Sequence, residues 1–156
     1  MNYTEPFIPT PEDIIPKMLK LASVAPGETV FDLGSGDGRI LIVAARDFRA
    51  KAVGVETRMR LVKDCRERVD RLGLSDQVTV LRGSFKTVTL READVLALYL
   101  SSYVLNQMAP RFSKELRPGT RIVNFDYEIP GWTPAREIQV VPAGWRKPHP
   151  VYLYVM

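Results

Sequence analysis

The sequence predicts an α/β fold, with a mostly parallel sheet of seven strands, helices on both of its faces and an antiparallel hairpin at the C-terminal end. Short apolar runs alternate with amphipathic segments along most of the chain, which is typical of strands joined by crossover helices. The runs are almost wholly apolar, as expected of strands buried on both faces. The last two runs instead alternate apolar with polar residues and have no helix between them, which indicates a hairpin at the sheet edge.

The composition fits one ordinary globular domain, in which we expect residues 1–27 to form a segment and a helix ahead of a core spanning residues 28–156. The chain has 156 residues, 46% hydrophobic and 26% charged, and a domain of this length buries a sizeable core. No apolar run approaches the roughly 20 residues of a membrane span, and the first residues lack the features of a signal peptide. The single cysteine, Cys65, excludes an internal disulfide and a cysteine metal cluster. We therefore expect a cytoplasmic protein with no metal and no membrane contact.

The charge pattern gives no sign of a dedicated nucleic-acid binder. The net charge of +4 is mild, and the basic residues are interspersed with acidic ones. Proteins that bind nucleic acids usually gather their basic charge on one face. A nucleic-acid partner is therefore not required.

The N-terminal prolines predict an extended stretch that leads into a helix. Pro9 and Pro11 force the residues before them into extended geometry. Thr10 is suited to cap a helix that starts at Pro11. Apolar residues then recur at helical spacing as far as Ala22, and a Pro-Gly pair ends the helix.

From Thr29 onward, strands and helices alternate. The predicted strands, each an apolar or β-branched run, are Thr29–Leu33, Ala52–Glu56, Val78–Leu81, Asp94–Leu100 and Arg121–Tyr127. The predicted helices between them are Arg39–Phe48, Arg58–Leu72 and Ser102–Leu116. The expected hairpin pairs Arg136–Val141 with Val151–Met156.

A glycine-rich loop follows the first predicted strand and carries the strongest functional signal. Its sequence, Asp32-Leu33-Gly34-Ser35-Gly36-Asp37-Gly38-Arg39, lies between a strand and a helix, the context that gives such a motif its meaning. The first two glycines permit backbone angles that a side chain would forbid and let a ligand approach closely. The third permits tight packing of helix on strand. Open α/β sheets bind ligands at this end of their strands.

Glu56 supplies the second half of the signal. It ends the second predicted strand, 22 residues after Gly34, where a carboxylate can accept hydrogen bonds from both hydroxyls of a ribose. An ordinary tight connection is the alternative explanation of the loop, and the placement of Glu56 makes it the weaker one. The spacing is G-x-G-x-G, not the G-x-G-x-x-G of dinucleotide sites, and Asp32 and Asp37 would repel a pyrophosphate. Two carboxylates suit a ligand that carries an ammonium and a sulfonium.

These residues resemble the class I, seven-strand methyltransferases, which are Rossmann-like α/β proteins that use S-adenosylmethionine. Five segments resemble, more narrowly, the small broad-specificity protein lysine methyltransferases of archaea and their mitochondrial relatives. They are Phe7–Pro11, Asp32–Arg39, Leu98–Leu100, Asn124–Trp132 and Val151–Tyr154. The resemblance implies S-adenosylmethionine as the methyl donor, S-adenosylhomocysteine as the product and exposed lysines of proteins as substrates. We expect a monomer.

The resemblance also implies which residues contact the cofactor. Asp32 and the glycine loop would hold its methionine part, Glu56 its ribose, and the residues after the third strand its adenine. Many relatives carry an acid at the position of Ser84, so this chain departs from the pattern there. The Pro9-Thr10 segment would fold over the cofactor. The residues expected to contact it are Thr10, Asp32, Gly34, Ser35, Gly36, Gly38, Glu56, Ser84, Phe85 and Tyr99.

Tyr99 and Asp126 are the expected catalytic residues. Methyl transfer from a sulfonium is an in-line displacement, in which the protein mainly aligns the reacting atoms. The pKa of lysine, about 10.4 unperturbed, falls in a partly dry pocket beside a cation, so a strong base is not essential. Tyr99 is expected to orient the amine and to face it with its ring, unless it is a core tyrosine. Asp126 is expected to hold the lysine ammonium, unless it is a turn or cap residue.

Three further residues allow structural interpretations. Trp132 either covers the pocket or anchors the Pro130-Gly131 turn. His149, the single histidine, lacks obvious partners for a triad or a zinc site and is expected to be structural, at the hairpin edge. Cys65 is expected to be a small core residue.

Other functions remain open from the residues alone. An RNA or small-molecule methyltransferase would share the fold, and a nucleotide-binding module would bind the cofactor without catalysis; a nicotinamide oxidoreductase ranks last. No Asn-Pro-Pro-Tyr motif follows the fourth strand and no Pro-Cys pair exists, which disfavours methylation of adenine N6, glutamine and cytosine C5. The chain also has no insertion that could form a lid, and an open site suits a large substrate such as a protein.

Overall fold

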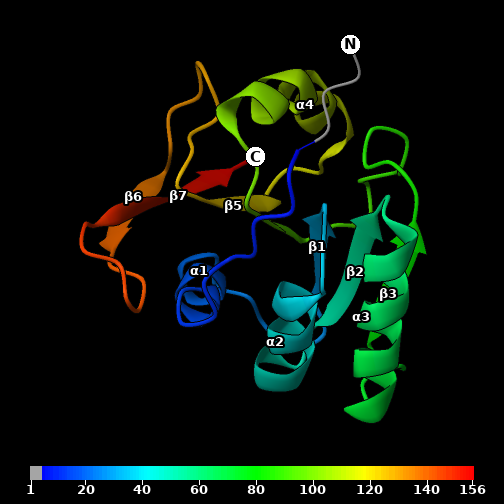
Figure 1. Ribbon diagram of the computed structural model, residues 1–156. Helices are drawn as coiled ribbons and strands as arrows, with labels where there is room; N and C mark the ends of the chain where they lie inside the picture. Colours follow the sequence, from blue (N-terminus) through cyan, green and yellow to red (C-terminus); the bar gives the residue numbers. More distant parts are fainter. Residues whose placement is uncertain (1–4) are drawn as a thin grey trace.

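The computed structural model describes residues 5–156 and is built around a seven-stranded sheet in the order β3-β2-β1-β4-β5-β7-β6. All neighbouring strands are parallel except β5–β7 and β7–β6. Successive strands run outward from β1 to β3 and then return to β4, so the sheet reverses its direction of growth between β1 and β4 (Figure 1). The predicted fold is therefore confirmed. The strands are β1 (Thr29–Leu33), β2 (Lys51–Glu56), β3 (Val78–Arg82), β4 (Val95–Leu98), β5 (Arg121–Phe125), β6 (Arg136–Val140) and β7 (His149–Val155).

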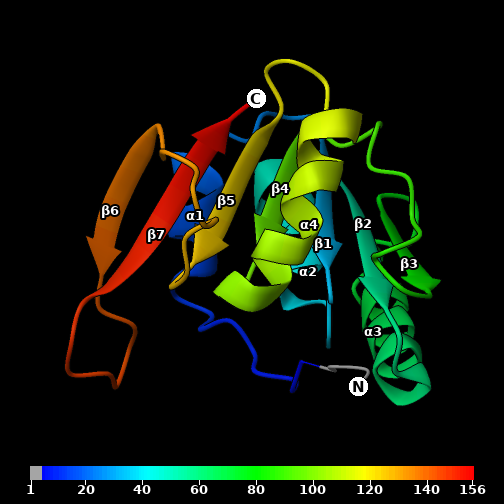
Figure 2. The ribbon, with the colours of Figure 1, turned by 90° about the horizontal axis from the view of Figure 1, so that it is seen from above.

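Helices cover both faces of the sheet, as Figures 1 and 2 show. On one face, α1 (Ile15–Leu21), α2 (Arg39–Phe48) and α3 (Met59–Arg71) share one buried apolar cluster with alternate residues of the strands. On the other face, α4 (Ser102–Glu115) forms a second cluster with the remaining strand residues. Because side chains point to alternate faces along a strand, almost wholly apolar strands can supply both clusters.

Helix α1 begins later than its capping pattern predicts. Thr10 is not its N-cap; Ile14 is, without a side-chain hydrogen bond. Pro16 explains the difference, because proline has no N–H with which to continue a helix from the preceding turn and is best tolerated within the first helical positions. The N–H of Met18 makes the first helical hydrogen bond, to the carbonyl of Ile14, at 3.0 Å. Thr10 is thus left in the extended stretch before the helix, where it is buried.

Two strands end earlier than predicted. β4 ends at Leu98, because the backbone of Leu100 bonds a side chain and not the backbone of a neighbouring strand. The Oδ1 of Asn124 accepts from the Leu100 N–H at 3.0 Å, and its Nδ2 donates to the Leu100 carbonyl at 3.2 Å. β5 ends at Phe125, because Asp126 has a φ of +74°, outside the extended region. The expected hairpin is confirmed as β6 and β7, although β7 already begins at His149.

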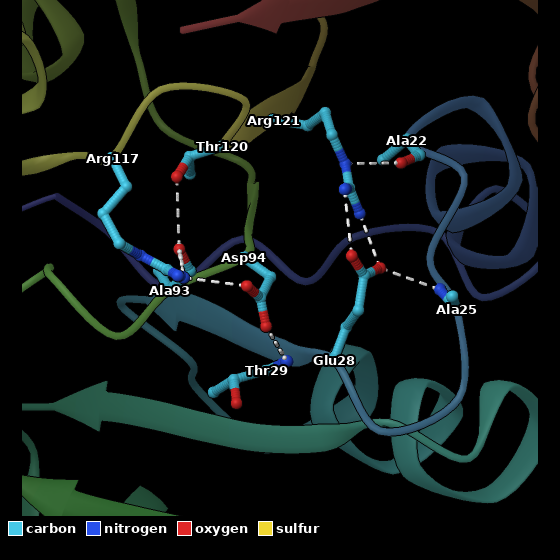
Figure 3. A network of polar contacts seen from close by, with 9 residues as sticks. All are labelled: Ala22, Ala25, Glu28, Thr29, Ala93, Asp94, Arg117, Thr120 and Arg121. Atoms are coloured by element: carbon cyan, nitrogen blue, oxygen red, sulfur yellow. Dashed lines mark hydrogen bonds and ion pairs between the residues drawn. The ribbon is translucent and has the colours of Figure 1, made fainter.

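Charged side chains connect the segments at the edge where the parallel strands begin (Figure 3). Arg121, the first residue of β5, donates through both terminal nitrogens to the carboxylate of Glu28 and through Nε to the carbonyl of Ala22 at 3.0 Å. Asp94 accepts from the N–H of Thr29 at 2.8 Å. These contacts join the end of α1 to the beginnings of β1, β4 and β5, on the side opposite the candidate site.

No helix in residues 5–156 is long and apolar enough to cross a membrane. The same residues contain no group of three or more His, Cys, Asp or Glu side chains placed to hold a metal ion.

Candidate active site

A cavity of about 340 Å³ lies at the carboxyl ends of the parallel strands. The segments that line it are distant in sequence: the stretch 5–10, the loop after β1, the end of β2, the loop at 83–86 and residues between 99 and 107. Figure 2 shows the N-terminal stretch running along this edge of the sheet. The cavity therefore lies at the point where the sheet reverses direction, the ordinary ligand position of an open α/β sheet.

The glycine loop has the backbone that its sequence predicts. Gly34, Gly36 and Gly38 have φ values of +80°, +56° and +80°. A Cβ at Gly36 would overlap the ring of Phe7, and one at Gly38 would overlap the Sγ of Cys65. Gly34 lines the cavity, whereas Gly36 lies beneath Phe7 and Gly38 caps α2 against α3. The third glycine thus serves helix packing, and the first two shape the loop around the cavity.

Asp32 is the least compensated charge of the cavity. It is buried, and desolvation, followed by the negative charges of Glu56 and Asp37, raises the pKa of its carboxyl to about 8. Within residues 5–156 it has no hydrogen-bond or ion-pair partner, and the buried Oγ of Ser35 beside the cavity has none either. A ligand with an ammonium group would supply the partner that Asp32 lacks, so the residues present fit the amino-acid end of a cofactor such as S-adenosylmethionine.

Glu56 is oriented by the backbone around it. Its Oε1 accepts from the N–H of Gly36 at 3.1 Å, and its Oε2 accepts from the N–H of Arg58 at 2.8 Å. The carboxylate lines the cavity. Because each oxygen can accept more than one hydrogen bond, Glu56 keeps acceptor capacity for the hydroxyls of a ribose.

Arg39 compensates the other carboxylate of the loop. It forms a two-pronged ion pair with Asp37, 2.7 Å at its shortest, and donates to the carbonyl of Thr10 at 3.0 Å. Burial opposes ionisation of Asp37, but these hydrogen bonds and the charge of Arg39 hold its pKa below the usual range. Of the two loop carboxylates expected to meet a cationic ligand, only Asp32 is therefore left without an ion-pair partner in the described residues. Arg39 also fastens the N-terminal stretch at Thr10, which lines the cavity.

Ser84 and Phe85 line the cavity on the side of the loop that follows β3. The Oγ of Ser84 accepts from the N–H of Lys86 at 3.2 Å, so this hydroxyl partly serves its own turn. Arg111 of α4 holds the loop by donating to the carbonyl of Phe85 at 2.7 Å. The ring of Phe85 and the hydroxyl of Ser84 thus belong to a loop that Arg111 holds in place.

Tyr99 lies at the other end of the cavity, just past β4. Its ring stacks with that of Tyr127 at a centroid distance of 6.3 Å and meets Phe125 edge-on at 4.9 Å. Burial, followed by the negative charge of Asp126, raises the pKa of the Tyr99 phenol to about 12. The phenol therefore stays protonated and can donate a hydrogen bond. Asp126 does not line the cavity; its carboxylate bonds His149 instead.

The remaining candidates are resolved by packing. Trp132 packs edge-on against Phe112 and Tyr154 and does not line the cavity, so it anchors its turn and the alternative of a pocket cover is wrong. Cys65 is a buried core residue, as predicted, and burial raises the pKa of its thiol to about 11. His149 lies in the hairpin, as expected, and its Nδ1 is 2.7 Å from Oδ1 of Asp126.

Several residues around the site escape sequence reasoning. Asn124 is fully buried and bonds the backbone of Leu100, next to Tyr99, and the carbonyl of Tyr127. A polar residue inside the apolar run of β5 is the signal that could have revealed it. Glu5 accepts from the N–H of Ser101 at 3.1 Å, a contact between residues 96 positions apart. Nothing in the local sequence predicts it, because it depends on the tertiary course of the N-terminal stretch.

The fold and the site together define a class I methyltransferase that uses S-adenosylmethionine as its cofactor. The chain belongs to the family of the ANTKMT methyltransferase domain, whose model matches residues 32–136. A protein-lysine N-methyltransferase of Saccharolobus islandicus (strain REY15A) is 40% identical over 97% of this chain and 93% of its own length. The adenine nucleotide translocase lysine N-methyltransferase of Mus musculus is 32% identical over 83% of this chain, which spans 56% of that protein.

Solved structures agree with this assignment. An RNA methyltransferase from Salinibacter ruber, crystallised with S-adenosyl-L-homocysteine, superposes with a TM-score of 0.88 at 36% identity, covering 95% of this chain and 93% of its own. Both full-length similarities are thus to methyltransferases, and they differ in the kind of substrate that their names state.

Proposed function

We propose that this protein transfers a methyl group from S-adenosylmethionine to the Nζ of lysine side chains in proteins. The observation that carries the proposal is Tyr99, which lines the cavity and stacks with Tyr127, with the carboxylate of Asp126 close enough to affect the pKa of Tyr99. Aromatic faces and a carboxylate together attract an ammonium. The relative from Saccharolobus islandicus, similar along almost its whole length, supports the same substrate.

The residues of the cavity divide into three groups in this proposal. Asp32, Ser35 and the glycine loop hold the amino-acid end of the cofactor, with Thr10 and the rest of the stretch 5–10 covering it. Glu56 takes the ribose hydroxyls, and Ser84 and Phe85 border the adenine. When bound, the sulfonium supplies the methyl group and a positive charge.

Tyr99 and Asp126 act on the substrate. Asp126 receives the lysine as an ammonium, and Tyr99 aligns it through its hydroxyl and ring. Only the neutral amine is a nucleophile, and its formation is favoured in a partly dry site beside a cation. The lysine ammonium releases its proton to water before the transfer. A strong base in the protein is therefore not required.

The proposed location is the cytoplasm, and the proposed active unit is one chain. The one cysteine is a free, buried thiol, so the fold does not depend on an oxidising compartment. Light scattering on the purified protein measures its mass in solution, and a dimer would contradict the second part.

Labelled cofactor tests the substrate. The purified protein is incubated with methyl-labelled S-adenosylmethionine and either an array of single-lysine peptides, the same array with arginine in place of lysine, or total cellular RNA. We expect label in the lysine peptides, located on Nζ by mass spectrometry, and loss of at least about tenfold in Asp32→Ala. Label in RNA alone would overturn the proposal and favour the activity named for the relative from Salinibacter ruber.

A further inference from the structure

Asp126 and His149 form a polar pair, in which Asp126 has a role in the proposed methyl transfer and His149 has none so far. Nδ1 of His149 lies 2.7 Å from Oδ1 of Asp126. A carboxylate only accepts hydrogen bonds, so Nδ1 carries the proton and donates it. Asp126 also has a positive φ, and its N–H donates to the carbonyl of Pro150 at 2.8 Å. The first two residues of β7 therefore hold both the side chain and the backbone of Asp126.

The pair lies at the edge of the sheet that holds the cavity. β7 runs antiparallel to β5, so its first residue meets the end of β5 (Figure 2). The buried ring of Phe125 is 4.9 Å from that of Tyr99 and 6.1 Å from that of His149, measured between centroids. Trp145 packs edge-on against His149 at 4.6 Å. A row of rings thus leads from the histidine to the cavity.

The surroundings of Asp126 are negative. After burial, its charge raises the pKa of Tyr99, and the charges of Glu137, Glu128 and then Asp126 raise the pKa of Tyr152. In the described part of the chain, His149 is the one potentially cationic side chain within ion-pair distance of Asp126. The carboxylate side chain is 19% exposed, so an incoming ammonium can reach it without displacing an arginine or a lysine.

We propose that His149 is a positioning residue for the substrate: by holding one oxygen of Asp126, it aims the other at the ammonium of the arriving lysine. This inference rests on the proposed lysine methylation. His149 acts through Asp126 and does not touch the substrate. Without the donated hydrogen bond, the carboxylate is free to turn, and the ammonium loses an oriented partner. The cavity walls that hold the cofactor come from other elements and remain unchanged.

Steady-state kinetics with the peptide that the wild type methylates best on the array test the role. We expect His149→Ala to raise KM for the peptide about 3- to 10-fold, the effect of one lost hydrogen bond, with kcat and the Kd of S-adenosylmethionine nearly unchanged. His149→Asn keeps an N–H near the position of Nδ1 and should restore KM. Asp126→Asn should raise KM as much, and adding His149→Ala to it should have no further effect. Val141→Ala, an exposed change in the same hairpin, is the control.

A binding measurement decides independently of turnover. N-acetyl-lysine methylamide and its norleucine analogue are titrated into the protein while the ring protons of Tyr99 and Tyr127 are followed by NMR. His149→Ala should weaken the lysine probe several-fold and leave the norleucine probe unchanged. Equal loss of both probes, or no loss of either, would overturn the role of His149. A wild type that methylates no peptide would instead contradict lysine methylation, while the probes still report on His149.

Discussion

The buried surroundings of Asp32 oppose the ionisation of its carboxyl, and a cationic ligand would favour it. With a pKa of about 8 in the folded chain and an ordinary value of 3.8, its contribution to stability is fully present below about pH 4 and is lost as the pH rises through about 8. In the protein without ligand, Asp32→Asn should therefore raise the melting temperature at pH 8 by a few degrees, since about 1 kcal/mol corresponds to about 2–4 °C at this size. Calorimetric scans of both forms at pH 5 and pH 8 measure the difference, which should shrink at the lower pH.

The same carboxyl should make cofactor binding depend on pH. Below its pKa of about 8, binding of an ammonium must first release the proton of Asp32, so affinity should weaken roughly 25- to 50-fold between pH 8 and pH 6. Above about pH 8, the α-amino group of the cofactor begins to lose its own proton, and affinity should fall again. Titration calorimetry in buffers of different ionisation enthalpy counts the protons released. A flat profile from pH 6 to 8 would show that Asp32 is already ionised in the free protein.

At the scale of elements, Gly38 connects the loop to two helices. It caps α2 with a φ of +80°, and a Cβ there would overlap Cys65 of α3. Gly38→Ala should cost about 2–4 kcal/mol, from the left-handed backbone and the overpacking together. Gly73→Ala is the matched control: its φ is +68° but nothing lies within 4 Å of the added carbon, so about 1–2 kcal/mol is expected.

Urea unfolding of the single variants and of Gly38→Ala/Cys65→Ala separates the two causes. If the overlap matters, removing the sulfur should recover part of the loss, and the double-mutant cycle should show a positive coupling. Equal losses in Gly38→Ala and Gly73→Ala would mean that backbone strain alone makes glycine necessary at position 38.

The elements also show where sequence reasoning succeeds. The apolar strands, the glycine turn and the hairpin follow from local periodicity, and the sheet follows from their order. The start of α1 was missed because Pro16 overrides a good capping residue at Thr10. The ends of β4 and β5 were missed because Asn124 and Asp126 act through partners in other strands. The positions of Asp32 and Glu56 at the site can be predicted from the sequence, because Asp32 precedes the glycine loop and Glu56 ends the next strand. The contact of Glu5 with Ser101 depends on tertiary structure alone.

At the scale of the whole molecule, the polar network at the edge opposite the cavity connects the end of α1 to the beginnings of β1, β4 and β5. Hydrogen bonds from Arg121 hold the pKa of Glu28 below its usual range; burial opposes ionisation of Asp94, but the Thr29 N–H and Arg117 still lower its pKa. Groups with lowered pKa values contribute stability above their ordinary values, and this stability is lost as the pH falls through the lowered ones.

Arg121→Gln should therefore destabilise the protein at pH 7 by about 1–2 kcal/mol, between the values for exposed and for buried ion pairs. The difference from wild type should narrow as the pH falls below the ordinary value of 4.5 and through the lowered pKa of Glu28, where this carboxylate becomes protonated. Arg46→Gln breaks the more exposed pair with Asp47 and should change the urea midpoint very little. A deficit in Arg121→Gln that persists unchanged at pH 3 would point to lost packing and not to lost charge.

The reversed direction of β7 decides at which edge of the sheet its first residues lie: the edge where the parallel strands end, or the edge where they begin. The strand has seven residues, so it spans about 23 Å at the usual rise per residue. Had it run with its neighbours, position 149 would face the Arg121 side, that distance away from Tyr99. One inverted strand thus returns the C-terminal part of the chain to the edge where the parallel strands end, and places His149 beside Asp126.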